Sequence, residues 1–242
     1  MTTRKRADVL LVERGLFDSR TRAKAAIEAG FVTADGVVLR KASDGVALDA
    51  RLEADDHPWV SRGALKLTAA LDHFGFDPAG RVCLDVGAST GGFTDVLLAR
   101  GARRVYAVDV GRDQLHARLR GHPAVMSLEE TDIRTLDPAR LAEPPDFATV
   151  DVSFISLKLV LPALERLLRR PAQLVALIKP QFEAGKAHLK KGIVRDPAVH
   201  AAVCDDVVAF AASLGWDVSG IIPSPIEGGE GNREFLLGAR MH

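Results

Sequence analysis

The sequence predicts an α/β protein in which a parallel sheet, covered by helices on both faces, follows a small α+β domain. From Val82 onward, short apolar runs of strand type alternate with helical stretches, which is typical of a parallel sheet joined by crossover helices. A glycine-rich turn, Gly87–Gly92, links the first strand to its helix, where open α/β sheets bind ligands. Before the sheet, Asp35-Gly36 stands between two apolar runs, a pattern typical of a β-hairpin.

The composition limits the class of protein. The 242 residues suffice for one large domain or for a large and a small one, and 47% hydrophobic with 26% charged residues is typical of globular proteins. No metal-ligand spacing is present, and Cys83 and Cys204 are expected to be buried, reduced thiols. No apolar run follows Arg4–Arg6 as in a signal peptide, and no stretch of about 18 apolar residues could span a membrane. We therefore expect a cytoplasmic protein that binds neither a metal nor a membrane.

Residues 1–56 are expected to form the first domain, with two helices and a short hairpin. Gly15 and Gly30 end the helices, because glycine readily takes the left-handed conformation of a C-terminal cap, and Ser19 precedes the second helix as an N-cap. The expected elements are helices over 7–14 and 20–29 and strands over 31–33 and 37–39.

Basic residues are concentrated at the start of the chain, although the formal net charge is zero. Residues 1–24 hold seven Lys and Arg against three acidic residues, whereas residues 42–56 hold five acidic residues against Arg51. Arg20 and Lys24 are four apart and share a helix face, so they can follow the phosphates of a nucleic acid. A solvated helix face is the alternative interpretation.

Residues 15–24, 27–32 and 35–36 resemble the S-four-like RNA-binding domain, which recurs in ribosomal proteins, pseudouridine synthases and tRNA synthetases. The resemblance covers nearly all of residues 4–53 and implies binding to structured RNA, mostly through its shape and phosphates. The segment 186–192 is interpreted either as a lid that contacts RNA or as a solvated loop. The residues expected to contact RNA are Arg4, Arg6, Arg20, Arg22, Lys24, Lys190 and Lys191.

Residues 57–60 are expected to be a linker and residues 61–242 the second domain. Trp59 is expected to pack between the domains rather than to stack on a base, since an aromatic side chain in a linker usually packs. Parallel strands are expected over 82–86, 105–108, 125–128, 147–151 and 174–178, and a final pair, partly antiparallel, over 217–222 and 233–237. Helices are expected over about 61–74, 93–100, 113–119, 157–169 and 197–214.

The turn after the first strand differs from two common nucleotide-binding motifs. Position 89 is Ser where a dinucleotide fingerprint has its second glycine, and no Gly-Lys-Ser/Thr of a P-loop follows. An acid at the start of the turn, without a phosphate-binding lysine, suits a zwitterionic amino-acid ligand. Asp109 follows Gly87 by 22 residues, where a carboxylate can accept both ribose hydroxyls, or it caps the strand end. Asp132 is placed to accept from an adenine amino group or to cap a turn.

Together these features resemble the S-adenosylmethionine site of Rossmann-like methyltransferases, which makes S-adenosylmethionine the expected cofactor. The expected fold is therefore a Rossmann-like, S-adenosylmethionine-dependent methyltransferase sheet with a small N-terminal α+β RNA-binding domain. The residues expected to bind the cofactor are Asp85, Gly87, Ala88, Ser89, Gly91, Gly92, Phe93, Asp109 and Asp132.

The segment after the fourth strand limits which kinds of atom can accept the methyl group. A nucleic-acid N-methyltransferase usually has an Asn/Asp-Pro-Pro-Tyr-like run there, whereas this chain has Asp151-Val152-Ser153-Phe154. A cytosine-C5 enzyme needs a nucleophilic cysteine there, and neither cysteine of this chain is so placed. An alcohol remains, and because a hydroxyl must lose its proton as it attacks, a base is required.

Two lysines and two acids are candidates for that chemistry: Lys66, Asp151, Lys179 and Glu234. A lysine serves as a base when desolvation or cationic neighbours lower its pKa. Lys179 ends an apolar strand and is expected to face the cofactor's sulfonium and Lys66, while the two acids orient the amines. Each residue also has an ordinary interpretation, as a solvated helix lysine, a strand-end acid or an edge-strand charge.

The whole chain resembles the TlyA family, which joins an S-four-like domain to an FtsJ-like methyltransferase domain. The family implies 2′-O-methylation of cytidine in ribosomal RNA by a Lys-Asp-Lys-Glu tetrad, which falls here on the four candidates above. The chain ends at Arg240-Met241-His242 and resembles the short form of the family, which implies a large-subunit target. The segments that carry the resemblance are 61–67, 85–93, 151–157, 179–185 and 231–235.

The resemblance implies ribosomal RNA or a ribosomal subunit as the partner and leaves the oligomeric state open. A non-catalytic RNA-binding assembly factor is the first alternative, against which the intact turn and the four tetrad candidates argue. A membrane-active haemolysin, a label that this family often carries, is the second alternative, and the missing apolar span and signal argue against it.

Overall fold

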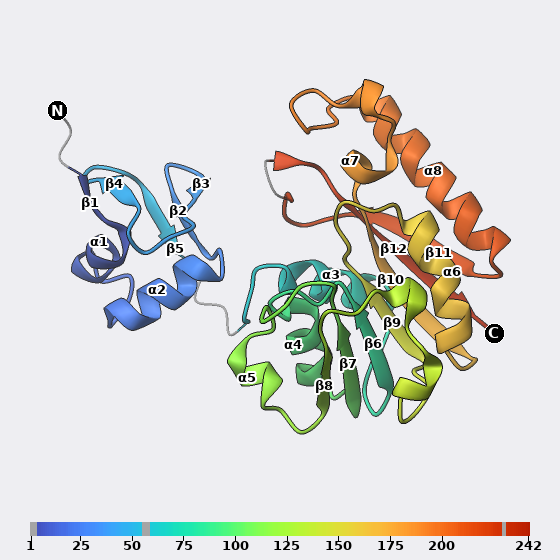
Figure 1. Cartoon of the computed structure of the whole chain (residues 1–242). Coiled ribbons are helices and arrows are strands. Elements are labelled where there is room, and N and C mark those ends of the chain that lie inside the picture. The colour runs from blue at the N-terminus through green and yellow to red at the C-terminus, as the bar shows by residue number, and fades with distance from the viewer. Residues whose placement is uncertain (1–3, 55–58, 229–230) are drawn as a thin grey trace. The chain divides into compact units, whose positions relative to one another are not determined.

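The computed structural model describes residues 4–54, 59–228 and 231–242. The chain divides into two compact units, Met1–Arg62 and Gly63–His242, which are considered one at a time (Figure 1). Residues 57 and 58 of the expected linker lie outside the described residues.

The small unit is built from two helices and short antiparallel strands around its own apolar core. Ser19 caps the second helix, since its hydroxyl accepts from the Arg22 N–H at 3.3 Å. Leu11 and Ile27, one from each helix, are buried in that core with Val32. The elements are β1 Arg4–Arg6, α1 Ala7–Glu13, α2 Arg20–Glu28, β2 Val32–Ala34, β3 Val37–Val38, β4 Gly45–Ala47 and β5 Leu52–Ala54.

The large unit contains a seven-stranded sheet with the order β11-β12-β10-β9-β6-β7-β8. The strands from β6 to β10 pair in parallel, whereas β12 runs antiparallel to both β10 and β11. The predicted fold class, including the antiparallel character of the final pair, is confirmed. The strands are β6 Val82–Val86, β7 Arg104–Val108, β8 Val125–Leu128, β9 Phe147–Val150, β10 Ala172–Ile178, β11 Asp217–Pro223 and β12 Phe235–Met241.

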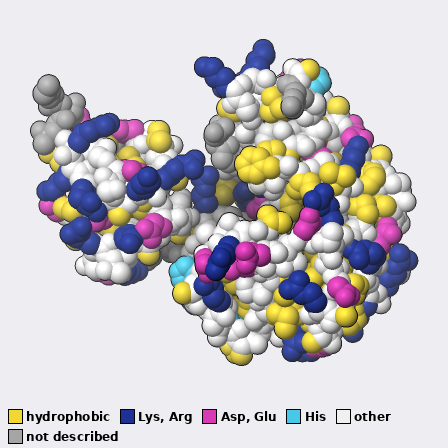
Figure 2. Space-filling model, in the orientation of Figure 1, with side chains coloured by type: hydrophobic (Ala, Val, Ile, Leu, Met, Phe, Trp, Pro, Cys, Tyr) yellow, Lys and Arg dark blue, Asp and Glu magenta, His cyan; other side chains and the backbone are white. Residues whose placement is uncertain are grey.

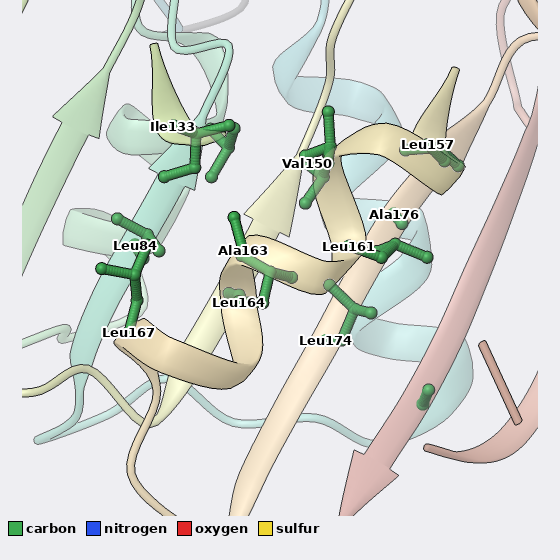
Figure 3. Close-up of a cluster of buried hydrophobic side chains, with 14 of the residues drawn as sticks. Leu84, Ile133, Val150, Leu157, Leu161, Ala163, Leu164, Leu167, Leu174 and Ala176 are labelled. Atoms are coloured by element: carbon green, nitrogen blue, oxygen red, sulfur yellow. The ribbon is translucent and has the colours of Figure 1, made fainter. Parts of the chain in front are cut away.

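Helices cover both faces of this sheet, with α3 and α4 on one face and α6 and α8 on the other (Figure 1). Figure 3 shows how α6 lays Leu161 and Leu164 against the strand residues Leu84, Val150 and Leu174, all of them buried. The helices are α3 Ala64–Phe74, α4 Gly92–Ala99, α5 Ala117–Arg120, α6 Leu157–Leu167, α7 Pro180–Glu183 and α8 Pro197–Ser213, with short 3₁₀ turns at Ile133–Thr135, Pro138–Arg140 and Lys186–His188.

The helix expected over 113–119 is wrong in its first half, because α5 begins only at Ala117. The carboxylate of Glu129, which follows β8, accepts the backbone N–H groups of Asp113, Gln114 and Leu115 at 3.0, 2.7 and 2.9 Å. These N–H groups are satisfied by a side chain instead of by a helical turn, so the segment remains a loop.

Helix α3 approaches β12 closely because the strand has a glycine at the crossing point. A Cβ atom on Gly238 would lie 2.5 Å from the ring of Phe74, so a larger residue would push the end of α3 outward. The contact matters for the site, because α3 carries Lys66 and Glu234 directly precedes β12.

Candidate active site

The candidate site lies where the parallel strands end, at the carboxyl edge of the large sheet. A cavity of about 570 Å³ opens there between the segments that follow β6, β7, β8 and β9. Ligands of open α/β sheets bind outside the carboxyl ends of the strands. The cavity is lined by five residues predicted for cofactor binding or catalysis: Gly87, Ser89, Asp109, Asp132 and Asp151.

The turn after β6 must begin with glycine. Gly87 has a φ of +81°, and a Cβ atom there would lie 2.3 Å from the backbone oxygen of Asp151. The N–H groups of Gly87 and Ala88 both donate to the carbonyl oxygen of Val108, at 2.8 and 3.1 Å. The turn therefore lies tightly between the ends of β7 and β9, and its backbone is exposed to the cavity at Gly87 and Ser89.

Asp109 and Asp132 line the cavity but already accept hydrogen bonds within the protein. Asp109 accepts from the N–H groups of Ser89 at 2.8 Å and Gly111 at 2.7 Å. A carboxylate has roughly four acceptor positions, so Asp109 retains capacity for ribose hydroxyls. Asp132 forms an ion pair with Arg134 at 2.6 Å, and this guanidinium holds the pKa of the Asp132 carboxyl below its usual range.

Five residues predicted to bind the cofactor lie behind the cavity wall in the described part of the chain. Ala88, Gly91, Gly92 and Phe93 shape the turn and the start of α4, and Gly91 is in contact with Leu119 of α5. Asp85 is fully buried beneath the turn, where its carboxylate accepts from the hydroxyls of Thr94 at 2.6 Å and Thr149 at 2.9 Å. These residues support the cavity rather than line it.

The tetrad candidates form two ion pairs at the same edge of the sheet. Lys179 Nζ lies 2.6 Å from Asp151 Oδ1, and Lys66 Nζ lies 2.5 Å from Glu234 Oε2. In the pairing of β10 with β12, Ile178 is opposite Phe235, so Lys179 follows and Glu234 precedes the same rung of the sheet. The sheet therefore brings Asp151, Lys179 and Glu234 to one edge, and Lys66 of α3 joins them through its ion pair with Glu234.

The two ion pairs differ in their surroundings. The side chains of Lys66 and Glu234 are only 9% and 3% exposed, and Gly228 packs so closely that a Cβ atom would lie 2.1 Å from the Glu234 carboxylate. Asp151 is 22% exposed and lines the cavity. Of the two lysines, Lys179 is therefore the one whose partner meets the ligand space.

Three residues of functional interest were missed by the sequence reasoning. Ser153 accepts from Lys179 Nζ at 2.9 Å and lines the cavity. Phe154 is 91% exposed beside the cavity, with a φ of +64° and its ring 5.0 Å from that of Phe182. Glu183 joins the loops after β9 and β10, accepting from the Ser156 hydroxyl at 2.6 Å and the Leu157 N–H at 2.8 Å. An aromatic residue in a short polar loop after a strand was the available signal for Phe154.

The seven residues predicted to contact RNA are all exposed. Five lie in the small unit, where several Lys and Arg side chains cover the face shown in Figure 2. The two others, Lys190 and Lys191, lie in the loop between α7 and α8, where the Lys190 and Ile193 backbones pair. No grouping of three or more His, Cys, Asp or Glu side chains that could hold a metal ion occurs among the residues described.

Known proteins resemble the chain along nearly its whole length. A family model described as FtsJ-like methyltransferase matches residues 59–241. The 16S/23S rRNA (cytidine-2′-O)-methyltransferase TlyA of Mycobacterium tuberculosis is 46% identical, over 99% of this chain and 91% of that protein. This chain belongs to the TlyA family of FtsJ-like methyltransferases.

Two further members show the breadth of the TlyA family. The 23S rRNA (cytidine-2′-O)-methyltransferase TlyA of Campylobacter jejuni is 38% identical, over 80% of this chain and 74% of that protein. A solved structure from Streptococcus thermophilus, named as a hemolysin, is 43% identical with a TM-score of 0.78, covering 100% of this chain and 90% of that one. In the described part of the chain, every helix is too short or too polar to cross a membrane.

Substitution of Gly87 by alanine is expected to distort the turn after β6 and so to weaken binding of the cofactor. The added Cβ would meet backbone atoms and not a flexible side chain, at a φ that disfavours alanine, so the turn must shift. Affinity for S-adenosylmethionine, measured by calorimetry, should fall about tenfold or more. Gly185→Ala is the control, because its Cβ would meet nothing within 4 Å. Unchanged affinity in Gly87→Ala would contradict the assigned turn.

Asp85 is expected to make stability depend on pH. Burial raises the pKa of its carboxyl from 3.8 to about 6, against the opposing hydrogen bonds from Thr94 and Thr149. Because the folded pKa is the higher one, this contribution to stability is present below pH 3.8 and is lost as the pH rises through about 6. The loss should amount to about 3 kcal/mol at most.

Urea unfolding of the wild type and of Asp85→Asn across this pH window measures the effect. The difference between their free energies of unfolding should change with pH, whereas Asp72→Asn, an exposed acid paired with Arg100, should follow the wild type. Parallel curves for Asp85→Asn and the wild type would show that Asp85 does not titrate in this window.

Proposed function

We propose that this protein transfers the methyl group of S-adenosylmethionine to the 2′-hydroxyl of a cytidine in ribosomal RNA, with Lys179 as the base. The observation that carries the proposal is the Lys179–Asp151 ion pair of 2.6 Å at the edge of the cavity. Family membership supports methyl transfer, and the names of the two TlyA relatives support a cytidine ribose of ribosomal RNA. Both names include 23S rRNA, so the large subunit is the proposed target. The proposed ribosomal substrate supports a cytoplasmic location for the protein.

The cavity residues fit the proposed cofactor. Gly87 lets the backbone approach a ligand without a side chain, Ser89 adds a hydroxyl, and Asp109 supplies acceptors for ribose hydroxyls. Asp132 would face the adenine, with acceptors that it shares with Arg134. S-adenosylmethionine, when bound, supplies a methyl group whose bond to sulfur breaks as the acceptor oxygen attacks.

Lys179 would act with Nζ as a neutral amine, its own proton having passed to solvent, and would take the hydroxyl proton as the 2′-oxygen forms its bond to the methyl carbon. Asp151 and Ser153 hold Nζ in place, at 2.6 and 2.9 Å, before the reaction. The ammonium that forms stays next to the Asp151 carboxylate, which stabilises it. Lys66 and Glu234 form a second, more deeply buried pair, which joins helix α3 to the start of β12.

Replacement of Lys179 by alanine should lower methyl transfer to large ribosomal subunits by about 100-fold or more, the usual contribution of a general base. Transfer is measured as tritium from labelled S-adenosylmethionine, and binding of the cofactor should remain. Lys158→Ala is the matched control. Lys158 of α6 forms an ion pair with Asp206 of α8, and neither residue lines the cavity. Near wild-type turnover in Lys179→Ala would contradict the role of Lys179 as the base.

Phe154 is proposed to stack on the target base, because the residue is 91% exposed at the cavity and its ring packs against that of Phe182. Phe154→Ala should raise the KM for ribosomal subunits about tenfold, in line with the usual contribution of base stacking. Affinity for S-adenosylmethionine should stay unchanged. The exposed Leu159 of α6 gives the control, Leu159→Ala, which should leave KM as it is. Equal KM values for all three proteins would contradict stacking.

A further inference from the structure

One acidic residue of the small unit is buried among basic ones. Asp8 of α1 is only 3% exposed, and its carboxylate accepts from the guanidinium groups of two arginines. Arg6 donates from Nε at 3.0 Å and from a terminal nitrogen at 3.2 Å, and Arg20 donates from the same two kinds of nitrogen at 3.1 and 2.7 Å. The carboxylate thus joins β1 to α2 through two guanidinium forks, each made of two N–H groups of one arginine.

The hydrogen bonds to Asp8 fix the conformations of the two arginine side chains but leave them exposed to solvent. Each guanidinium has five N–H donors and uses two on Asp8, and the side chains are still 50% and 59% exposed. Both reach the same oxygen, Oδ2, so the two cations lie side by side. Hydrogen bonding from Arg6, followed by the contributions of Arg20, lowers the pKa of Asp8 to about 2, so the anchor stays ionised.

Lys24, also on α2, is held differently. It pairs with Glu28, which is 56% exposed. Surface pairs of this kind contribute little and do not fix a long side chain in one place. The buried anchor therefore sets Arg6 and Arg20 apart from Lys24.

We propose that Asp8 is a positioning residue that holds Arg6 and Arg20 as a preformed clamp for a single phosphodiester of the RNA. The proposal rests on the proposed function, because it assumes an RNA substrate. Planar guanidinium groups bind phosphate oxygens through paired N–H donors, and two adjacent groups suit one phosphate. Side chains that are already ordered lose less conformational entropy when the phosphate binds.

Replacing Asp8 by asparagine separates this idea from a simple charge effect. The substitution removes a negative charge from a basic surface, so charge alone would strengthen RNA binding. A positioning role predicts the opposite, a dissociation constant for purified large ribosomal subunits about fivefold higher or more, because the forks lose their ionised anchor. The KM for subunits should rise likewise while kcat stays unchanged.

Glu13→Gln is the matched control, because it also removes one acid from α1. Glu13 is 49% exposed and pairs with Lys5, so its loss frees a surface lysine. Binding by Glu13→Gln should stay equal to the wild type or become tighter. Binding by a folded Asp8→Asn that equals or exceeds that of the wild type would overturn the proposal, with thermal unfolding followed by circular dichroism establishing that each variant is folded.

A triple variant tests whether the two arginines bind one phosphate, and it can be used even if Asp8→Asn fails to fold. Asp8→Asn combined with Arg6→Gln and Arg20→Gln leaves no unpaired charge at the anchor. The slope of log affinity against log salt concentration should become shallower by about 0.7 to 0.9, the contribution of one phosphate contact. A change about twice as large would show two separate contacts, and no change would show none, and either result overturns the clamp.

The two proposals fail in distinguishable ways. If the wild type transfers no tritium to ribosomal subunits, the proposed function fails. If the wild type methylates subunits while the Asp8 variant and the triple variant bind them as the wild type does, only the clamp fails.

Discussion

The site depends on the register of three parallel strands, β6, β9 and β10. Val86 pairs with Val150 and Val150 with Ala176, so these strands present their carboxyl ends at one edge of the sheet. The turn that begins at Gly87, the acid after β9 and the lysine after β10 emerge together for this reason. A slip of one residue would turn the side chains of a strand to the opposite face and separate these groups.

Close packing then fixes the positions of the loops at this shared edge of the sheet. The Gly87 turn lies against the backbone of Asp151, and Glu183 joins the loop after β9 to the segment after β10. Removing charges from water costs free energy, and a buried ion pair must offset this cost before it stabilises the fold. The Lys179–Asp151 pair, whose carboxylate lines the ligand cavity, is better explained by chemistry than by stability.

Much of this arrangement could be predicted from the sequence, because apolar periodicity and glycine placement are local signals. They gave the sheet, most of its helices and the cavity residues Gly87, Asp109 and Asp151. The partners could not be predicted in this way. The pairing of Lys66 with Glu234, the hold of Glu129 on the loop before α5, and the burial of Asp85 all arise from long-range contacts. The strands β1, β4 and β5 have three residues each, too few for a periodic pattern.

The central claim concerns the atom that receives the methyl group. Digestion of large-subunit RNA to nucleosides after reaction with the protein, followed by mass spectrometry, locates that atom directly. The account predicts 2′-O-methylcytidine as the new product, with the added mass on the ribose fragment. A methyl group on a base fragment would contradict a hydroxyl acceptor and the role of Lys179 as its base.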